Sequence, residues 1–96
     1  MEELSRFDVA EYNGVFMVVI ESDLLPSDPA VVVVPLLSNY PAVKYLNPVL
    51  VHERKRLVLA TRLIAAVRRS NLQRAGNIKN QSELITRAIA VLMSGV

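Results

Sequence analysis

Alternating apolar and polar positions, separated by turn residues, dominate the first half of the chain. Residues 6–12 alternate, Asn13-Gly14 is a strong signal for a two-residue hairpin turn, and residues 15–20 return with β-branched and aromatic side chains. These features predict an antiparallel hairpin. A third strand is expected over residues 31–37, where Pro35 predicts an edge position or a bulge at a barrel corner, because proline donates no ladder hydrogen bond.

The middle of the chain predicts a second hairpin and then loses its periodicity. Residues 49–52 and 56–61 flank a charged turn at residues 53–55. Residues 63–67 fit either a buried strand or one turn of helix, and the polar segment 68–79 is predicted as a loop. Several short strands closed by one helix indicate a small α+β domain, mainly β, built on a partly closed antiparallel barrel.

The last patterned segment, residues 80–93, predicts an amphipathic helix. Asn80 and Glu83 have the spacing of a capping box, and Gly95 stands where a left-handed C-cap is expected. Only residues 94–96 follow the predicted helix, so its tip is the first place to look for function. The apolar positions recur at three-to-four spacing and are expected to face the core as one stripe: Leu84, Ile85, Ala88, Ile89 and Leu92.

Length and composition narrow the class of protein. Residues 1–96 suffice for a single domain with a modest core, and dimerisation would help to bury a chain that is 52% hydrophobic. The longest apolar run, residues 30–37, is far shorter than the ~20 residues of a membrane span. No secretory signal begins the chain, so a cytoplasmic protein is expected. With no cysteine, disulfides and thiolate chemistry are excluded.

Charge is distributed unevenly along the sequence. Residues 1–48 carry two basic and seven acidic side chains, a net charge of −5, whereas residues 49–96 carry nine basic and two acidic ones, a net charge of +7. This split fits a basic face for an acidic partner or for nucleic acid. It fits equally a barrel that interleaves the two halves in space and leaves the charges solvated.

Side chains suited to catalysis are few. His52 is the only histidine, which precludes a histidine-based metal cluster, and its place at a strand end favours a partly buried structural role. Glu21 and Asp23 could pair as carboxylates, although a strand end turning into a loop explains them more simply. Arg54-Lys55-Arg56 at the predicted hairpin tip could contact phosphate or an acidic tail, but no aromatic residue is interleaved to stack on bases. Binding without enzymatic turnover is therefore favoured, with no cofactor.

Four stretches along the chain form an ordered set that covers most of its length. They are Val19-Ile20-Glu21-Ser22-Asp23-Leu24-Leu25, Val33-Val34-Pro35-Leu36, Asn47-Pro48-Val49 with the later Ala60-Thr61, and residues 85–96, which end in Leu92-Met93-Ser94-Gly95-Val96. In this order and spacing they resemble the CcdB toxins of plasmid and chromosomal toxin-antitoxin modules.

The resemblance implies an SH3-like antiparallel β-barrel, of the CcdB/MazF kind, with one C-terminal α-helix. It also implies a homodimer and a cytoplasmic poison of DNA gyrase that is not an enzyme. In the family, the C-terminal helices of the toxin dimer enter the dimer formed by the A subunits of gyrase and trap the cleaved-DNA complex. A CcdA antitoxin with a disordered acidic tail wraps the toxin, and the toxin modulates antitoxin binding to operator DNA. The implied partners are the A subunit of DNA gyrase, a CcdA-like antitoxin and, through the antitoxin, operator DNA.

The resemblance also implies a gyrase-binding set. The family's adjacent isoleucines correspond to Leu24 and Leu25, two neighbouring leucines at a turn of which at least one should be exposed. The family's closing Phe-Trp-Gly-Ile corresponds to the run Met93-Ser94-Gly95-Val96, in which both aromatics are replaced, and its asparagine one turn earlier corresponds to Ala90. The implied residues are Leu24, Leu25, Ala90, Met93, Ser94, Gly95 and Val96.

Three functions stay open, in order of preference. The first is a toxin that binds gyrase despite the loss of an aromatic anchor, which at an interface centre commonly contributes more than ~2 kcal/mol. The second is a CcdB-fold protein without gyrase activity that binds an antitoxin, regulates, or has another target. The third is a ribonuclease, because the related MazF/Kid toxins share the barrel; its catalytic group would come from such residues as His52, Arg54, Arg56 or Thr61.

Overall fold

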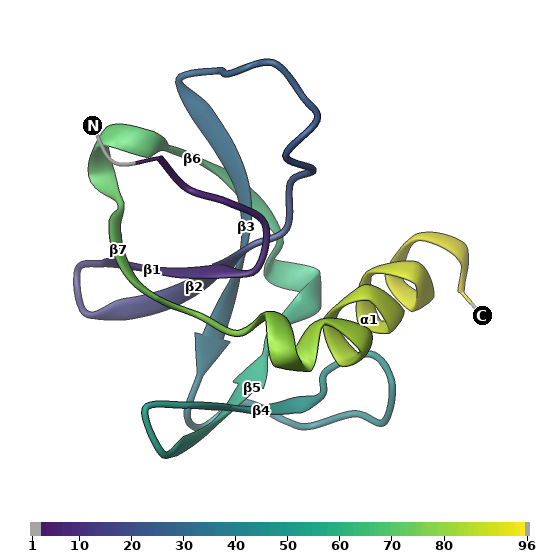
Figure 1. The fold of residues 1–96 in the computed structure, drawn as a ribbon. Helices are drawn as coiled ribbons and strands as arrows, with labels where there is room; N and C mark the ends of the chain where they lie inside the picture. Colours follow the sequence, from purple (N-terminus) through teal and green to yellow (C-terminus); the bar gives the residue numbers. More distant parts are fainter. Residues whose placement is uncertain (1–2, 96) are drawn as a thin grey trace.

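In the computed structural model, which describes residues 3–95, seven antiparallel strands form one curled sheet and a single α-helix follows them (Figure 1). The strand order is β4-β5-β3-β2-β1-β7, and β6 also pairs with β3. This arrangement confirms the predicted α+β, mainly β, class. The elements are β1 (Asp8–Tyr12), β2 (Val15–Val19), β3 (Ala30–Leu37), β4 (Val49–His52), β5 (Lys55–Leu59), β6 (Ala65–Arg68), β7 (Gln73–Asn77) and α1 (Ser82–Ser94), with 3-10 turns η1 (Thr61–Leu63), η2 (Arg69–Asn71) and η3 (Lys79–Gln81).

Both predicted hairpins are present, and both use two-residue turns; in the second, the turn is residues 53–54 and not 53–55, and β5 ends at Leu59 and not at residue 61. Asn13 and Gly14, between β1 and β2, have φ values of 52° and 77°. Glu53 and Arg54, between β4 and β5, have φ values of 51° and 64°, so that Lys55 already lies opposite His52 in the ladder. Positive φ at both central residues matches the right-handed twist of the strands that the turn joins.

Pro35 lies in a central strand, so the expected edge position is wrong. One side of β3 pairs with β2, and Pro35 lies opposite Met17 there. The other side pairs first with β6, as far as Val33, and then with β5, from Leu36 onward. Pro35 falls in the gap between these two partners, where its missing N–H costs no ladder bond. The register with β2 runs through Pro35 without a shift, so the expected bulge is not found there either; Pro35 instead marks the point where β3 changes neighbours.

Residues 73–77 form a strand, so the loop predicted for residues 68–79 is wrong there. β7 pairs antiparallel with β1, and the register shifts between Val9 and Ala10. Its sequence, Gln-Arg-Ala-Gly-Asn, contains no β-branched or aromatic residue, so its strand conformation depends on the free edge that β1 offers. The ambiguous residues 63–67 resolve into the end of η1 and the start of β6.

The sheet buries an apolar cluster on each face. The larger cluster includes Ile85 and Ala88 of α1, which pack against Val9, Val34 and other strand residues. Ile89 is half-buried against the same cluster. Leu84, however, is 46% exposed, so the predicted core stripe is wrong at this position. The smaller cluster on the other face consists of Ala10, Val19, Val31, Val33 and Leu72.

Of the two caps predicted for the helix α1, the structure contains the C-terminal one and not the N-terminal one. The predicted capping box is wrong: the helix begins at Ser82, and its N-cap residue is Gln81, whose side chain makes no cap hydrogen bond. The predicted C-cap is confirmed, because Gly95 has a φ of 72° and its N–H donates to the Val91 carbonyl at 2.8 Å. Glycine adopts this left-handed conformation without the steric cost that other residues meet.

Gln81 instead joins the start of α1 to the free edge of β4. Its side-chain oxygen accepts from the Val51 N–H at 2.9 Å and its side-chain nitrogen donates to the Val51 carbonyl at 2.7 Å. Next to this clasp, the buried His52 ring lies under β7, and a Cβ added to Gly76 would be 3.0 Å from His52 Cε1. In this zone the edge strand β4 contacts both β7 and the start of α1. We call it the seam and define it by four residues: Val51, His52, Gly76 and Gln81.

No helix among residues 3–95 is long and apolar enough to cross a lipid bilayer.

Candidate functional site

The C-terminal half of α1 projects away from the sheet and ends in solvent (Figure 1). Met93 is 72% exposed, and Ala90, Ser94 and Gly95 are also exposed. The Ser94 hydroxyl turns back along the helix and donates to the Ala90 carbonyl at 2.6 Å. Met93 is therefore the large apolar side chain that this tip offers. Val96, the last of the predicted gyrase-binding residues, lies outside the described residues.

The two adjacent leucines form a second exposed position, in the loop between β2 and β3. Leu24 is 95% exposed and Leu25 is 56% exposed, as expected for this turn. The Ser22 hydroxyl accepts from the Leu24 N–H at 3.2 Å, and the Ser22 carbonyl accepts from the Leu25 N–H at 3.3 Å. Leu25 lines a pocket of about 460 Å³ that the tip residues do not line. Within one copy of the chain, the predicted set thus forms two separate positions.

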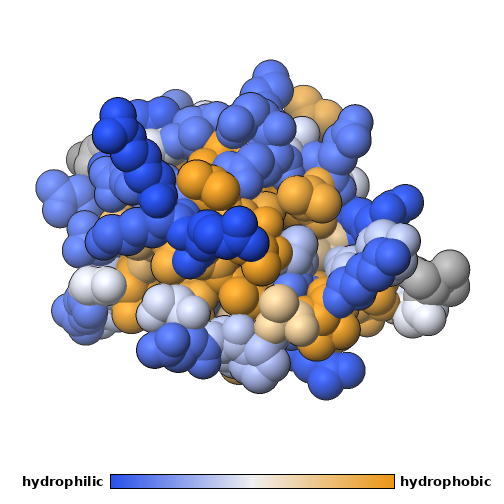
Figure 2. Space-filling view, turned by 90° about the horizontal axis from the view of Figure 1, so that it is seen from below, coloured by the Kyte–Doolittle hydropathy of each residue, from blue (hydrophilic) through white to orange (hydrophobic). Residues whose placement is uncertain are grey.

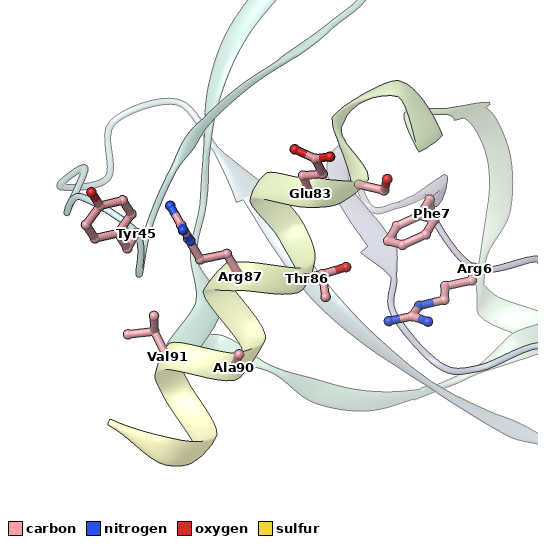
Figure 3. Close-up of a pocket in the computed structure, with 9 residues that line it drawn as sticks. Arg6, Phe7, Tyr45, Glu83, Thr86, Arg87, Ala90 and Val91 are labelled. Atoms are coloured by element: carbon pink, nitrogen blue, oxygen red, sulfur yellow. The ribbon is translucent and has the colours of Figure 1, made fainter. Parts of the chain in front are cut away.

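A groove of about 870 Å³ runs across the exposed face of α1 (Figure 3). Arg6 and Phe7 lie on one side of the helix and Tyr45 on the other, with Thr86 and Ala90 between them. A smaller, mainly apolar pocket of about 320 Å³ adjoins the groove and shares Tyr45 and Arg87 with it. The remaining residues of this pocket are Lys44, Pro48, Val49 and Leu84.

Tyr45 lines both the groove and the adjoining pocket. It is 48% exposed, and two cations flank its ring: the Arg87 guanidinium carbon lies 4.7 Å from the ring centroid and Lys44 Nζ lies 5.1 Å from it. Figure 3 shows the Arg87 side chain reaching from α1 toward the ring. Sequence reasoning missed Tyr45, because its neighbour on α1 is 42 positions away in the chain and no local pattern links the two.

A model of the CcdB protein family matches residues 6–95. The chain belongs to the CcdB family. The match runs from Arg6 through Gly95, and so includes all strands, α1 and both exposed leucines. CcdB proteins are toxins of toxin-antitoxin modules. No curated protein matches the chain individually.

The residues considered for ribonuclease chemistry in this CcdB-family chain do not meet at an exposed site. His52 is buried, with its ring edge-on to Phe16 at a centroid distance of 4.8 Å. Its Nε2 has no hydrogen-bond partner among residues 3–95 and lies 3.7 Å from the Glu53 carboxylate. Thr61 is fully buried, and its hydroxyl donates to the Leu46 carbonyl. Arg54 and Arg56 are exposed, on the hairpin turn and on β5, whereas the two candidate side chains His52 and Thr61 are buried. Among residues 3–95, no group of histidine and carboxylate side chains is arranged to hold a metal ion.

Glu21 and Asp23 serve local structure and do not form a carboxylate pair. Glu21 accepts from the Val32 N–H at 3.4 Å and forms an ion pair with Arg69 at 3.3 Å, with both side chains largely buried. Asp23 accepts from the Arg6 N–H at 2.8 Å. Each carboxylate is therefore oriented by a different partner, which agrees with the simpler of the two interpretations.

Ion pairs join the acidic N-terminal half to the basic C-terminal half. Glu21 pairs with Arg69, and the buried Asp8 pairs with Arg74 at 3.2 Å. The fold thus interleaves part of the charge split, as one of the two interpretations required. In contrast, Arg6, Lys44 and Arg87 around the groove contact aromatic rings, and no ion pair between described residues involves them.

Proposed function

We propose that this CcdB-family protein is a toxin that binds the A subunit of DNA gyrase and traps the cleaved-DNA complex without catalysing a reaction itself. The observation that carries the proposal is the projecting tip of α1. Its core-facing residues, Ile85 and Ala88, fix the first half of the helix to the sheet, while Met93 and Ser94 extend into solvent. A rigid exposed helix end of this kind can enter a cavity in a partner with little ordering cost.

The same proposal includes a homodimer and an antitoxin. Leu63, Ala65 and Ala66 are exposed on and beside β6, and a second copy would remove this apolar strip from water. A dimer would present two tips to the paired A subunits of gyrase. A CcdA-like antitoxin would neutralise the toxin in the cytoplasm and would carry the complex to operator DNA.

Met93 and the two leucines would supply the apolar contacts with gyrase. Few residues dominate most interfaces, and a flexible methionine adapts to a pocket shaped for another side chain. Leu24 and Leu25 would add a second contact area, because both leave much of their surface in water. Ala90 lies one turn before the tip on the exposed face and would be covered with it.

A cleavage assay tests this proposal. Purified protein is incubated with supercoiled plasmid and the gyrase of the source organism, and trapped complexes are released as linear DNA by detergent and protease. We expect linear DNA with the wild-type protein and none after deletion of residues 94–96. Met93→Ala should reduce trapping by about tenfold, whereas Met93→Leu, which keeps the apolar volume, should stay close to wild type.

Circular dichroism and sedimentation provide the control, because all three tip variants should fold and associate like the wild type. Failure of the wild-type protein to trap cleaved DNA with its own gyrase would contradict the proposal.

One observation favours a second candidate, a regulatory CcdB-fold protein that binds an antitoxin and leaves gyrase untouched. The Ser94 hydroxyl is folded back onto the Ala90 carbonyl, so Met93 is the main anchor that the described tip can offer. In that case the protein would change the affinity of its antitoxin for operator DNA in a gel-shift assay, while the cleavage assay would give no linear DNA.

A further inference from the structure

The turn of the β4–β5 hairpin combines a rare backbone conformation with three consecutive cations. Glu53 and Arg54 both have positive φ, of 51° and 64°, where the first hairpin uses Asn-Gly at residues 13–14. A long side chain in the left-handed region is less favourable than glycine or asparagine, and such positions cluster at functional sites. Arg54 therefore occupies a position that is unfavourable for its backbone, as expected of a side chain with a function at the turn, and Lys55 and Arg56 follow it directly.

The hairpin extends past the strand next to it. β3 pairs with only the last two residues of β5, so residues 50–57 form a two-stranded ribbon beyond β3. In this ribbon Lys55 lies opposite His52, and Arg56 is the next residue along the strand. Successive residues of a strand point to opposite faces, so these two residues place one cation on each face of the ribbon. Arg54 adds a third cation at its end.

The three cations are not neutralised by the described part of the chain. All three are exposed, and no ion pair between residues 3–95 involves them. Glu53, the one carboxylate of the turn, lies 3.7 Å from Nε2 of the buried His52. Figure 2 shows strongly hydrophilic side chains standing over apolar surface on the side of the molecule where β4 and β5 lie. The end of the hairpin thus presents positive charge that is available to an anionic partner.

The base of the ribbon is held in place by its neighbours. The Gln81 side chain binds both backbone groups of Val51, at 2.9 and 2.7 Å. The His52 ring lies edge-on to Phe16 at a centroid distance of 4.8 Å, and Gly76 leaves it room on the other side. A ribbon that is ordered before it binds loses little entropy on binding.

We infer that the end of the β4–β5 hairpin, residues 53–56, binds the phosphate backbone of double-stranded DNA directly and without sequence preference. The major groove of B-DNA admits a two-stranded β-ribbon, and phosphates flank it on both sides, as cations lie on both faces of this ribbon. The major groove of duplex RNA is too deep and narrow for such an approach. Single strands are bound by stacking on aromatic rings, and residues 53–56 contain none.

This contact goes beyond the proposed function, in which DNA reaches the protein only through gyrase or the antitoxin. Figure 1 shows the turn between β4 and β5 at the lower left and the end of α1 at the right. The hairpin and the projecting helix are therefore separate surfaces of one copy of the chain, and each can be altered without the other.

Fluorescence anisotropy with the full-length protein and a short fluorescein-labelled DNA duplex of random sequence tests the inference. Three phosphate contacts predict a loss of affinity of about 40-fold between about 50 and 200 mM sodium chloride. A second duplex of different sequence should bind within about twofold of the first, since phosphate contacts carry no sequence information. The double variant Arg54→Gln/Arg56→Gln should weaken binding at least about tenfold at the lower salt concentration and flatten the salt dependence.

Matched variants separate the hairpin from net charge and from folding. Arg6→Gln/Arg68→Gln removes the same charge from exposed positions outside the hairpin and should stay within about threefold of wild type. Arg54→Lys/Arg56→Lys keeps both charges and should also stay within about threefold, because lysine binds phosphate as a point charge. Arg54→Gly should raise the urea midpoint, since glycine adopts a φ of 64° freely, and should weaken DNA binding by about fivefold. A loss of fold cannot produce this pair of opposite changes.

Deletion of residues 94–96 keeps this inference separate from the gyrase proposal. The deletion should abolish trapping of cleaved DNA and leave binding of the duplex unchanged, so that either can fail without the other. Unchanged binding in Arg54→Gln/Arg56→Gln would overturn the inference, and so would an equal loss in Arg6→Gln/Arg68→Gln, because binding would then follow net charge alone. Tighter binding of polyglutamate than of the duplex, lost in the same hairpin variant, would assign the hairpin to an acidic protein and would also overturn it.

Discussion

The two ends of α1 differ in how they are held. At its start, Gln81 clasps both backbone groups of Val51 on β4, and Ile85 and Ala88 are buried against the sheet. At its end, Met93 and Ser94 lie in solvent, and the helix stops because Gly95 turns into the left-handed region. The first half of the helix therefore belongs to the core, and the second half is an exposed extension of it.

The difference teaches how one short helix can serve stability and binding at separate positions. A substitution at the buried end must refill a packed volume or open a cavity, so it is costly to the fold. A substitution at the exposed end changes a side chain that is already in contact with water, so its effect on the free energy of unfolding is small. A side chain such as Met93 or Ser94 can thus differ among family members without a change of fold, and under the proposed function the effect of such a difference would fall on binding.

The largest effect on the free energy of unfolding is expected at the buried end of α1. Ile85→Ala should lower the free energy of unfolding by about 3 kcal/mol, because it removes a fully buried side chain from the main cluster. Met93→Ala on the same helix should change it by less than about 0.5 kcal/mol. Urea denaturation of the two variants measures the contrast. Equal losses in both would mean that the tip packs against the protein in solution.

A smaller effect is expected at the seam that supports the start of α1. Gly76→Ala should cost about 2 kcal/mol, since alanine would have to adopt a φ of 152° and its Cβ would be 3.0 Å from His52 Cε1. Gly14→Ala is the matched control, because Gly14 also has a positive φ, of 77°, but no atom within 4 Å of the added Cβ. Denaturation midpoints of the two variants separate steric contact with His52 from backbone strain; a larger loss at Gly14 would contradict the proposed contact.

The smallest of the three concerns the Gln81 clasp. Gln81→Met keeps the length of the side chain and removes both hydrogen bonds to Val51, so unfolding should become about 1 kcal/mol easier. Hydrogen exchange gives a local readout, since the Val51 amide should lose protection more than the amides in the centre of β3. Unchanged protection at Val51 would show that the clasp is absent in solution.

Local signals predicted the elements whose formation is decided by neighbouring residues. Asn13-Gly14 fixes its hairpin because both positions need positive φ, and Gly95 ends the helix for a similar reason. β7 was missed, because residues 73–77 become a strand only when β1 offers an edge. The capping box failed for a related reason: the segment before the helix forms a 3-10 turn, and Gln81 uses its side chain on β4.

The residues of the candidate site also fall into those that the local sequence could predict and those that it could not. The exposure of Leu24 and Leu25 follows from a turn that cannot bury two adjacent leucines, so it could be predicted. The groove across α1 could not, because it joins a loop at residue 45, a helix at residue 87 and the N-terminal segment at residue 6. Leu84 fits the apolar period of α1, yet its side chain is not in the core. It lines the pocket next to Tyr45 and stays half-exposed.

Pairing of β1 with β7 also governs the order of events while the chain is being made. Asp8 and Asn77, which lie side by side in the finished sheet, are 69 positions apart. At ~5–20 residues per second, translation leaves the outer edge of β1 without its strand for a time on the order of seconds. During that interval the first hairpin has an unpaired strand edge, which is available for pairing with other nascent chains on the same mRNA. Synthesis of residues 73–77 supplies the partner strand that covers this edge, so protection of the first hairpin depends on the last strand to be made.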